Sequence, residues 1–357
     1  MKRWNRIKRL CCLLLAAMLM LNGCGKIGDG KKVVLTTGFD KDEIFRIETI
    51  SCSLPEVMVY LTNIQNQYEA IYGDGIWETN LRGVTLEENV KDTVLAKIAQ
   101  IKAMNLLAQK YNVELSERES ELAGRAAKEY FASLNETEIA GMGVGEETIK
   151  QLYSEYALAN KVYQYIIKDI NPEISDDEAR TITVEHILIK TYSLDGSGNR
   201  IPYTEEAKQE AYEKAQEICR MAQNGDDFEH LVASYSEDSK STYSFGKGEM
   251  ETAFEEAAFE LGNGEISDVV ETEYGYHIIK CISTFNRAET DANKVKIVEQ
   301  RRQEVFSQEY DVFVDGLTRN LNQELWDSVT FLHDEQIKTN SFFQVYNTYF
   351  GKSFATE

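Results

Sequence analysis

The chain has 357 residues, of which 60 are acidic and 38 are basic, and its formal net charge is −22. A protein this acidic is not expected to bind nucleic acid, because that affinity comes from lysine and arginine displacing the counterions of the phosphates. The length predicts two domains rather than one.

The first 23 residues have the pattern of a secretory signal peptide. Five basic residues within positions 2–9 precede an apolar run, Leu10 to Leu21, that is short for a membrane span. The run ends in the residues LNGC, which resemble the lipobox of bacterial lipoproteins. In that family the peptide is cut before the cysteine and the thiol is diacylated, so Cys24 is the expected lipidation site. Cleavage would change the net charge from −22 to −27, since residues 1–23 hold no acidic side chain.

The other cysteines of the mature chain are Cys52, Cys219 and Cys281, an odd and widely spaced set. Their spacing predicts neither a disulfide framework nor a zinc site, and no metal is expected. Cys219 and Cys281 fall in apolar segments, where a free thiol is most simply a small core side chain. Because anionic headgroups repel an acidic body, the membrane tether would be the lipid on Cys24.

Residues 24–172 are expected to form an N-terminal helical domain. Capping boxes at Ser53–Glu56 and Ser116–Glu119 predict two helix starts. Apolar residues recur at helical spacing between Leu86 and Ala108 and predict a third helix. The pattern predicts an all-helical region that ends at residues 171–172, an Asn-Pro pair.

The character of the chain changes over residues 181–284. Segments rich in β-formers alternate with three short helical patterns, which predicts a small α+β domain with the element order β-α-α-α-β-β. After it, a long helix is predicted over residues 290–325, with an apolar side at Val295, Val298, Val305, Phe313, Leu317 and Leu321. A helix this long must bury its apolar side, so residues 285–357 are expected to pack on the N-terminal helical domain.

Two histidines occupy similar strand positions. His186 in VEHILIK and His277 in YGYHIIK are each followed by large aliphatic residues and a lysine. Each can be a core histidine whose nitrogens are satisfied by neighbours, or a titratable group directed into a pocket. If the two strands are neighbours, both imidazoles meet on one face, and the two interpretations are then compatible.

Residues 181–284 contain three ordered motifs: HIL at 186–188, NGDDFEHLVASYSED at 224–238, and FGKGEMETAFEEAAFELGNGEISDVVETEYGYHIIK at 245–280. In these motifs and their order, the segment resembles the parvulin family of peptidyl-prolyl cis–trans isomerases. The resemblance implies a small antiparallel sheet with surrounding helices, an α+β domain inserted in a mostly α-helical, chaperone-like domain. It also implies an isomerase that needs no cofactor.

The resemblance implies two groups of site residues. The catalytic positions of the family match His186, Asp238 and His277. The apolar socket for the proline ring matches Phe245, Met250, Phe254 and Phe259. We expect the histidines to form a hydrogen-bonded pair that shapes a polar network and the aspartate to tune its polarity. No general base is required, because isomerisation breaks no bond.

The loop after Asp238 departs from the family pattern. Only the residues SKSTYS separate Asp238 from the Phe245-Gly246 pair, so the glycine-rich GGDLG run of the family is absent. Thr242 or Tyr243 stands in place of the usual pocket leucine. One wall of the proline socket is therefore expected to be missing or rebuilt.

The whole chain resembles the extracytoplasmic foldases of Gram-positive bacteria. This resemblance implies a lipid-anchored protein on the extracytoplasmic face of the cell membrane, which isomerises X-Pro bonds and assists the folding of secreted proteins. Its partners would be unfolded or partly folded secreted polypeptides. The alternative is a holdase chaperone with a catalytically degenerate parvulin domain, and whether the chain forms a homodimer stays open.

Lipidation at Cys24 can be tested by metabolic labelling. We expect the unaltered chain to incorporate palmitate and the Cys24→Ala variant to lose the label, because the thiol is the acylated atom. A variant that still labels would contradict the lipoprotein assignment and leave plain secretion with an ordinary thiol at this position.

Overall fold

The structure is a computed structural model that describes residues 38–81 and 83–351. The predicted signal peptide and Cys24 lie outside the described residues. Among those described, no helix combines the length and the apolar character that a membrane crossing needs.

The described chain divides into two compact units. The central unit is Ile170–Gln303. The flanking unit consists of the described residues up to 169 together with those from 304 to 351. The flanking unit is therefore built from two separate stretches of the chain, and each unit is described here by itself.

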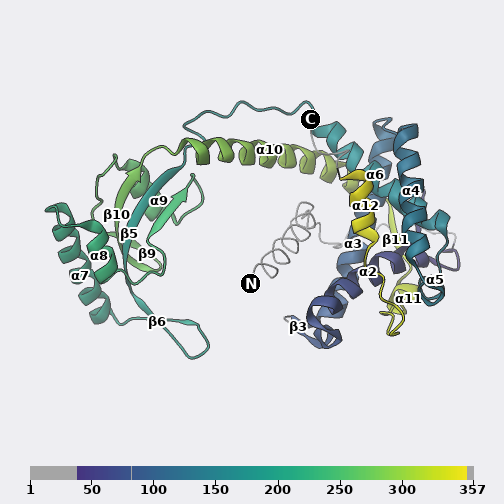
Figure 1. Ribbon diagram of the computed structural model, residues 1–357, viewed down its shortest axis with the longest axis horizontal. Helices are drawn as coiled ribbons and strands as arrows, with labels where there is room; N and C mark the ends of the chain where they lie inside the picture. The colour runs from purple at the N-terminus through teal and green to yellow at the C-terminus, as the bar shows by residue number, and fades with distance from the viewer. Residues whose placement is uncertain (1–37, 82, 352–357) are drawn as a thin grey trace. The chain divides into compact units, whose positions relative to one another are not determined.

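Helices make up most of the flanking unit (Figure 1). They are α2 (Leu54–Tyr72), η1 (Asp74–Glu78), α3 (Leu86–Lys110), α4 (Glu117–Ser133), α5 (Glu136–Met142), α6 (Glu146–Ile167), α11 (Gln323–Asp327) and α12 (Phe342–Phe350). The predicted capping boxes are confirmed at the starts of α2 and α4, where Glu56 and Glu119 complete the reciprocal bonds. The predicted helix from Leu86 is confirmed as α3.

The expectation of an all-helical region is wrong at its start. Strands β1 (Glu43–Ile47) and β2 (Ile50–Ser53) pair antiparallel, and β11 (Arg319–Leu321) joins the other side of β1. A second, two-stranded ribbon is formed by β3 (Asn80–Leu81) and β4 (Val84–Thr85). These strands are short, and the partner β11 lies near the other end of the chain, so local patterning could not reveal the pairing.

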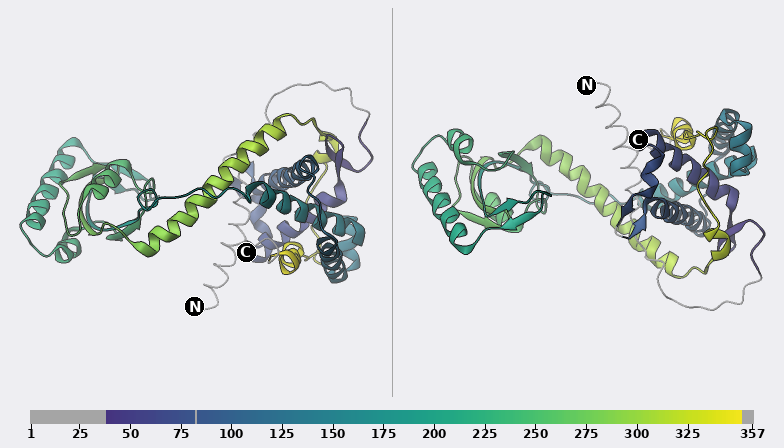
Figure 2. Two further views of the ribbon diagram at one scale, coloured as in Figure 1. Left: turned by 90° about the horizontal axis from the view of Figure 1, so that it is seen from above. Right: turned by 90° about the horizontal axis from the view of Figure 1, so that it is seen from below.

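The long helix after the central domain is shorter than predicted. α10 runs from Arg287 to Asp315 and is unbroken in each view (Figure 2). Its predicted apolar side is only partly buried: Val298 and Phe313 are half-buried, but Val295 and Val305 are exposed. Val305 is 43% exposed, whereas the next residue, Phe306, is 4% exposed. Phe306 packs edge-on against Tyr163 at a ring-centroid distance of 4.8 Å. Leu321, which was expected on this helix, pairs with Phe45 in the sheet instead.

The C-terminal helix α12 completes the aromatic core of the flanking unit. Phe342 is 1% exposed and stacks on Tyr153 at 4.4 Å, and Tyr130 and Tyr60 contact it from other directions. The hydroxyl of Tyr153 also donates a hydrogen bond to the backbone oxygen of Phe342. The C-terminal tail is thus part of the core of the flanking unit.

The central unit contains a four-stranded antiparallel sheet in the order β8-β5-β10-β9. Its strands are β8 (Thr242–Phe245), β5 (Ile182–Lys190), β10 (Gly275–Ser283) and β9 (Val270–Thr272). β6 (Tyr192–Leu194) and β7 (Arg200–Pro202) form a separate hairpin. The predicted fold class, a small antiparallel sheet with helices in a mostly helical chain, is confirmed. The predicted element order was incomplete, because it lacked the hairpin and β8.

Helices cover both faces of this sheet (Figure 1). α7 (Glu205–Gln223) and α8 (Phe228–Tyr235) pack on the face that carries Ile187, Ile189, Tyr276 and Ile278. α9 (Thr252–Glu260) packs on the other face, with Ile182, Val184 and Ile279. Since side chains alternate along a strand, His186 and His277 fall on the α9 face. The buried thiols of Cys219 and Cys281 confirm their interpretation as core residues.

Truncation of Phe342 tests the role of the tail in the flanking unit. We expect Phe342→Ala to lower the free energy of unfolding of this unit by about 3–5 kcal/mol, because a fully buried ring leaves a cavity. All three tryptophans lie outside the central unit in sequence, and Trp77 packs on Phe331 at 4.5 Å, so tryptophan fluorescence in urea reports this unit. Tyr72→Ala, at a ring that is 64% exposed, is the matched control; an equal loss in both variants would contradict the assignment.

Candidate active site

The two histidines lie on the neighbouring central strands. The register pairs Ile279 with His186 and His277 with Leu188, which makes the imidazoles diagonal neighbours on one face. Their Nδ1 atoms are 3.1 Å apart, and the rings stack at 17° with centroids 5.2 Å apart. His186 is 2% and His277 is 6% exposed. The structure therefore brings the two predicted histidines together.

The acceptors around His186 determine the direction of the hydrogen bonds. Its Nε2 lies 3.2 Å from Oδ2 of Asp238 and 3.3 Å from the backbone oxygen of Lys240. An ionised carboxylate and a carbonyl can only accept, so Nε2 carries the hydrogen and Nδ1 of His186 accepts from Nδ1–H of His277. Nε2 of His277 is then an acceptor for the Thr272 hydroxyl at 2.8 Å. The chain of bonds runs one way, from Thr272 to Asp238, through two neutral imidazoles.

Burial favours the neutral form of both imidazoles. Burial, together with the neighbouring His186, lowers the pKa of His277 to about 3. Burial also lowers the pKa of His186, although the backbone oxygen of Lys240 and the carboxylate of Asp238 act in the opposite direction. The free-energy cost of protonating a desolvated imidazole exceeds the stabilisation that these two acceptors provide. Both rings are therefore neutral at neutral pH.

Asp238 remains ionised beside this pair. Burial acts to raise the pKa of Asp238, but hydrogen bonds from the Tyr243 hydroxyl and the backbone N–H of Lys240 bring it below its usual value. The Tyr243 hydroxyl donates to Oδ2 at 3.0 Å, and the Lys240 N–H donates to Oδ1 at 3.4 Å. The carboxylate is thus a charged acceptor at the end of the histidine chain.

Apolar side chains pack beside the imidazoles on the α9 face. Phe254 meets both rings edge-on, at 5.5 Å from His186 and 5.1 Å from His277. Phe254 and Phe245 are buried, whereas Met250 and Phe259 are half-buried and pack against the same cluster. The four predicted socket residues are therefore gathered in one apolar cluster, in which Phe254 touches the histidines.

A solvent-exposed turn precedes Met250 and holds it in this cluster. The carboxylate of Glu255 accepts hydrogen bonds from the backbone N–H groups of Gly248, Glu249 and Met250. Gly248 has a φ of +83°, which a residue with a side chain rarely adopts. Glu255 sits one turn into α9, so the helix that carries Phe254 also sets the position of Met250.

The sequence analysis missed Thr272 and the contacts of Tyr243. Thr272 reaches His277 because β9 and β10 are joined by a tight turn that pairs Thr272 with Gly275. Gly275 is required at this turn: a Cβ atom there would lie 2.1 Å from the backbone oxygen of Ile189. The hairpin could be predicted from the sequence, but its register, which brings the Thr272 hydroxyl to the imidazole, could not.

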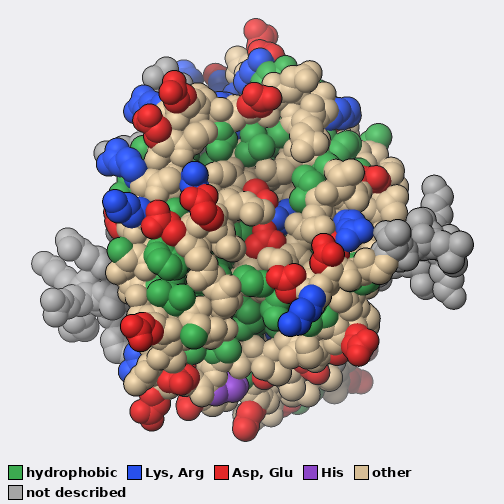
Figure 3. Space-filling view, turned by 90° about the vertical axis from the view of Figure 1, so that its right-hand side faces the viewer, with side chains coloured by type: hydrophobic (Ala, Val, Ile, Leu, Met, Phe, Trp, Pro, Cys, Tyr) green, Lys and Arg blue, Asp and Glu red, His purple; other side chains and the backbone are tan. Residues whose placement is uncertain are grey.

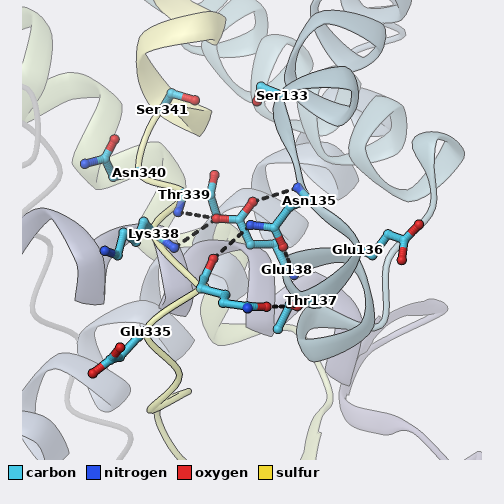
Figure 4. Close-up of a pocket in the computed structure, with 11 residues that line it drawn as sticks. Ser133, Asn135, Glu136, Thr137, Glu138, Glu335, Lys338, Thr339, Asn340 and Ser341 are labelled. Atoms are coloured by element: carbon cyan, nitrogen blue, oxygen red, sulfur yellow. Dashed lines mark hydrogen bonds between the residues drawn. The ribbon is translucent and has the colours of Figure 1, made fainter.

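A cavity of about 730 Å³ lies in the flanking unit, lined by α5 and the C-terminal tail. Figure 4 shows that its lining groups bind one another: the Glu138 carboxylate accepts from the backbone N–H groups of Lys338 and Thr339, at 2.9 and 2.7 Å. Figure 3 shows acidic, basic and apolar side chains mixed on one face of this unit, around a hollow. The hydrogen bonds in the cavity join α5 to the C-terminal tail, which is a structural role.

Comparisons with known proteins agree with the motifs in the central unit. Residues 186–283 match the family model described as rotamase, PPIC-type PPIASE domain. Foldase protein PrsA of Geobacillus kaustophilus is 29% identical over 229 residues, which cover 62% of this chain and 69% of the relative. Foldase protein PrsA of Caldanaerobacter subterraneus is 25% identical over 253 residues, 68% of this chain and 74% of the relative.

Among solved structures, a crystal structure of peptidylprolyl isomerase (PrsA) from Bacillus cereus is 21% identical. It covers 75% of this chain and 97% of its own, with a TM-score of 0.37. The expected enzyme class, a parvulin-type peptidyl-prolyl cis–trans isomerase, is confirmed by the family match over the segment that holds both histidines. Residues 186–283 are therefore a parvulin-type isomerase domain, carried by a chain that is similar to PrsA foldases over about two thirds of its length.

Proposed function

We propose that this protein is a lipid-anchored foldase on the extracytoplasmic face of the cell membrane, which isomerises X-Pro bonds of secreted polypeptides. The observation that carries the enzymatic part is the Nδ1–Nδ1 contact of His186 and His277, with Phe254 against both rings. The leader pattern and the lipobox-like residues before Cys24 support the location. The foldase relatives support the assignment of secreted polypeptides as clients.

The site fits a reaction in which no bond is broken. Rotation about an X-Pro amide has to cross a barrier of roughly 18–20 kcal/mol, because twisting removes the C–N resonance. A catalyst needs only to bind the twisted amide more tightly than either planar form. Groups with fixed hydrogen-bond directions and no net charge suit this task, since a twisted amide changes its polarity without acquiring a full charge.

In our proposal, each predicted site residue has one role. His186 and His277 form a hydrogen-bonded pair whose ring nitrogens keep a fixed orientation beside the substrate. Asp238 maintains that orientation as the charged acceptor of His186. Met250 and Phe254 form the socket for the proline ring, with Phe245 and Phe259 supporting it from the core. Residues 181–284 would act as the isomerase, and residues 24–172 with 285–357 would hold the unfolded client.

A protease-coupled assay with a prolyl peptide tests the enzymatic part. We expect residues 25–357 to accelerate isomerisation, and both His186→Ala and His277→Ala to lower kcat/KM at least about tenfold, because each leaves a buried partner without its hydrogen bond. His230→Ala, at an exposed histidine of α8, is the matched control and is expected to retain full activity. An uncatalysed rate with continued suppression of client aggregation would favour the holdase instead.

The neutral state of His277 also predicts how stability depends on pH. In the unfolded chain this histidine binds a proton near its ordinary pKa of 6.5, but in the folded chain only near pH 3. The unfolded state therefore binds more protons between these values, and the folded central unit loses stability as the pH falls through that window. The contribution of His277 is up to about 1.4 kcal/mol per pH unit.

This dependence can be measured by urea unfolding followed by the amide NMR signals of β5 and β10. We expect His277→Gln to flatten the slope of unfolding free energy against pH between about 3 and 6.5, because glutamine does not titrate. The exposed control His230→Gln is expected to keep the slope. If His277→Gln keeps it as well, His277 is not buried in its neutral form.

A further inference from the structure

The link between Asp238 and β8 holds Tyr243 on the face of His186. In the β5–β8 register, Tyr243 is paired with Val184, and the backbone N–H of His186 donates to the oxygen of Ser241 at 2.8 Å. Val184 and His186 are two residues apart on one strand, so their side chains share a face. Tyr243 is therefore a diagonal neighbour of His186, and it follows Asp238 by only five residues.

Tyr243 contacts both Asp238 and His186, the two residues at the carboxylate end of the hydrogen-bonded chain. Its hydroxyl donates to Oδ2 of Asp238 at 3.0 Å, the same atom that lies 3.2 Å from Nε2 of His186. Its ring meets the His186 ring edge-on, at a centroid distance of 5.3 Å and an angle of 67°. Nζ of Lys240 also contacts the phenol, at 4.4 Å from the ring centroid.

We propose that Tyr243 is a positioning residue of the isomerase site: its hydroxyl orients Asp238 toward His186, and its ring is the side wall that the short link provides. This inference rests on the proposed isomerase function and deepens it. No evident signal in the sequence assigns this role, because only the strand pairing brings the phenol beside the imidazole.

The need for such a residue follows from the position of Asp238. Its side chain is 24% exposed, so without the Tyr243 hydroxyl the carboxylate, held by His186 and by the backbone N–H of Lys240 at 3.4 Å, is freer to turn toward water. His186 would then retain the backbone oxygen of Lys240 as its acceptor, which is neutral and more distant at 3.3 Å. A charged acceptor fixes the tautomer of His186 more strongly than a carbonyl. Tyr243 thereby acts on His277 through two intermediate groups.

The groups that face Asp238 determine how the site responds to pH. They are His186 from β5, Tyr243 from β8, and the backbone N–H groups of Ser239 and Lys240 from residues 239–241. His277 on β10 follows behind His186, and the Lys240 ammonium lies against the Tyr243 ring. Burial, and then the bond to Asp238, raises the pKa of Tyr243, so the phenol remains a donor at neutral pH. Removal of that donor is expected to raise the pKa of Asp238.

The first experiment compares Tyr243→Phe with the unaltered chain, residues 25–357, in the prolyl-peptide assay. Phenylalanine keeps the ring and removes the donor, so we expect kcat to fall about threefold to tenfold with little change in KM. The acidic limb of the pH profile is expected to move to higher pH. Tyr243→Ala removes the wall as well and is expected to raise KM. Tyr276→Phe, a buried tyrosine on the opposite face of β10, is the matched control and is expected to change nothing.

The second experiment uses ¹⁵N NMR to measure which ring nitrogen of each histidine carries the hydrogen. This measurement does not require isomerase activity. In the unaltered chain we expect the ring hydrogen of His186 on Nε2 and that of His277 on Nδ1. In Tyr243→Phe the Nε2–H fraction of His186 is expected to fall. Identical histidine spectra and pH profiles in the two proteins would overturn the positioning role.

The two experiments also separate this inference from the proposed function. An unaltered chain without isomerase activity would end the proposed function. A change in the tautomer of His186 in Tyr243→Phe would still support the positioning role in such a chain. Full activity of the unaltered chain together with an unchanged Tyr243→Phe would overturn the positioning role alone.

Discussion

The central unit depends on one hydrogen bond between two uncharged imidazoles. His186 and His277 come from strands that are far apart in sequence, and their Nδ1 atoms meet at 3.1 Å in a buried position. A buried charge at either ring would be costly, so the site requires that both rings stay neutral. That requirement determines which nitrogen of each ring carries the hydrogen. It also determines the direction of the hydrogen bonds at the two ends of the chain, from Thr272 to His277 and from His186 to Asp238.

The residues around the histidine pair stabilise this one arrangement of hydrogen bonds. Phe254 packs against both rings, and Glu255 of the same helix holds the backbone that carries Met250. Tyr243 supplies a second donor to Asp238. An isomerase site of this kind needs preorganised polarity rather than a reactive group, so the residues that orient the pair matter as much as the pair itself.

The flanking unit shows a different reason why local patterns fail. The capping boxes at α2 and α4 were predicted correctly because a helix start is specified within four residues. The apolar side of α10 was predicted only in part, since Val305 and Phe306 fit the helical period almost equally well and only packing against Tyr163 selects one of them. β11 was missed because its partner β1 lies near the other end of the chain.

The sequence by itself determined the kind of domain: the spaced motifs around His186, Asp238 and His277 indicated a parvulin, and the apolar residues expected to form its socket could be named by type. Only the tertiary structure decided how these groups act on one another. Hydrogen-bond direction, ring contacts and the positions of Thr272 and Tyr243 depend on strand register, and a shift of one residue would move each side chain to the opposite face. Register arises from pairing between distant segments, which no local pattern contains.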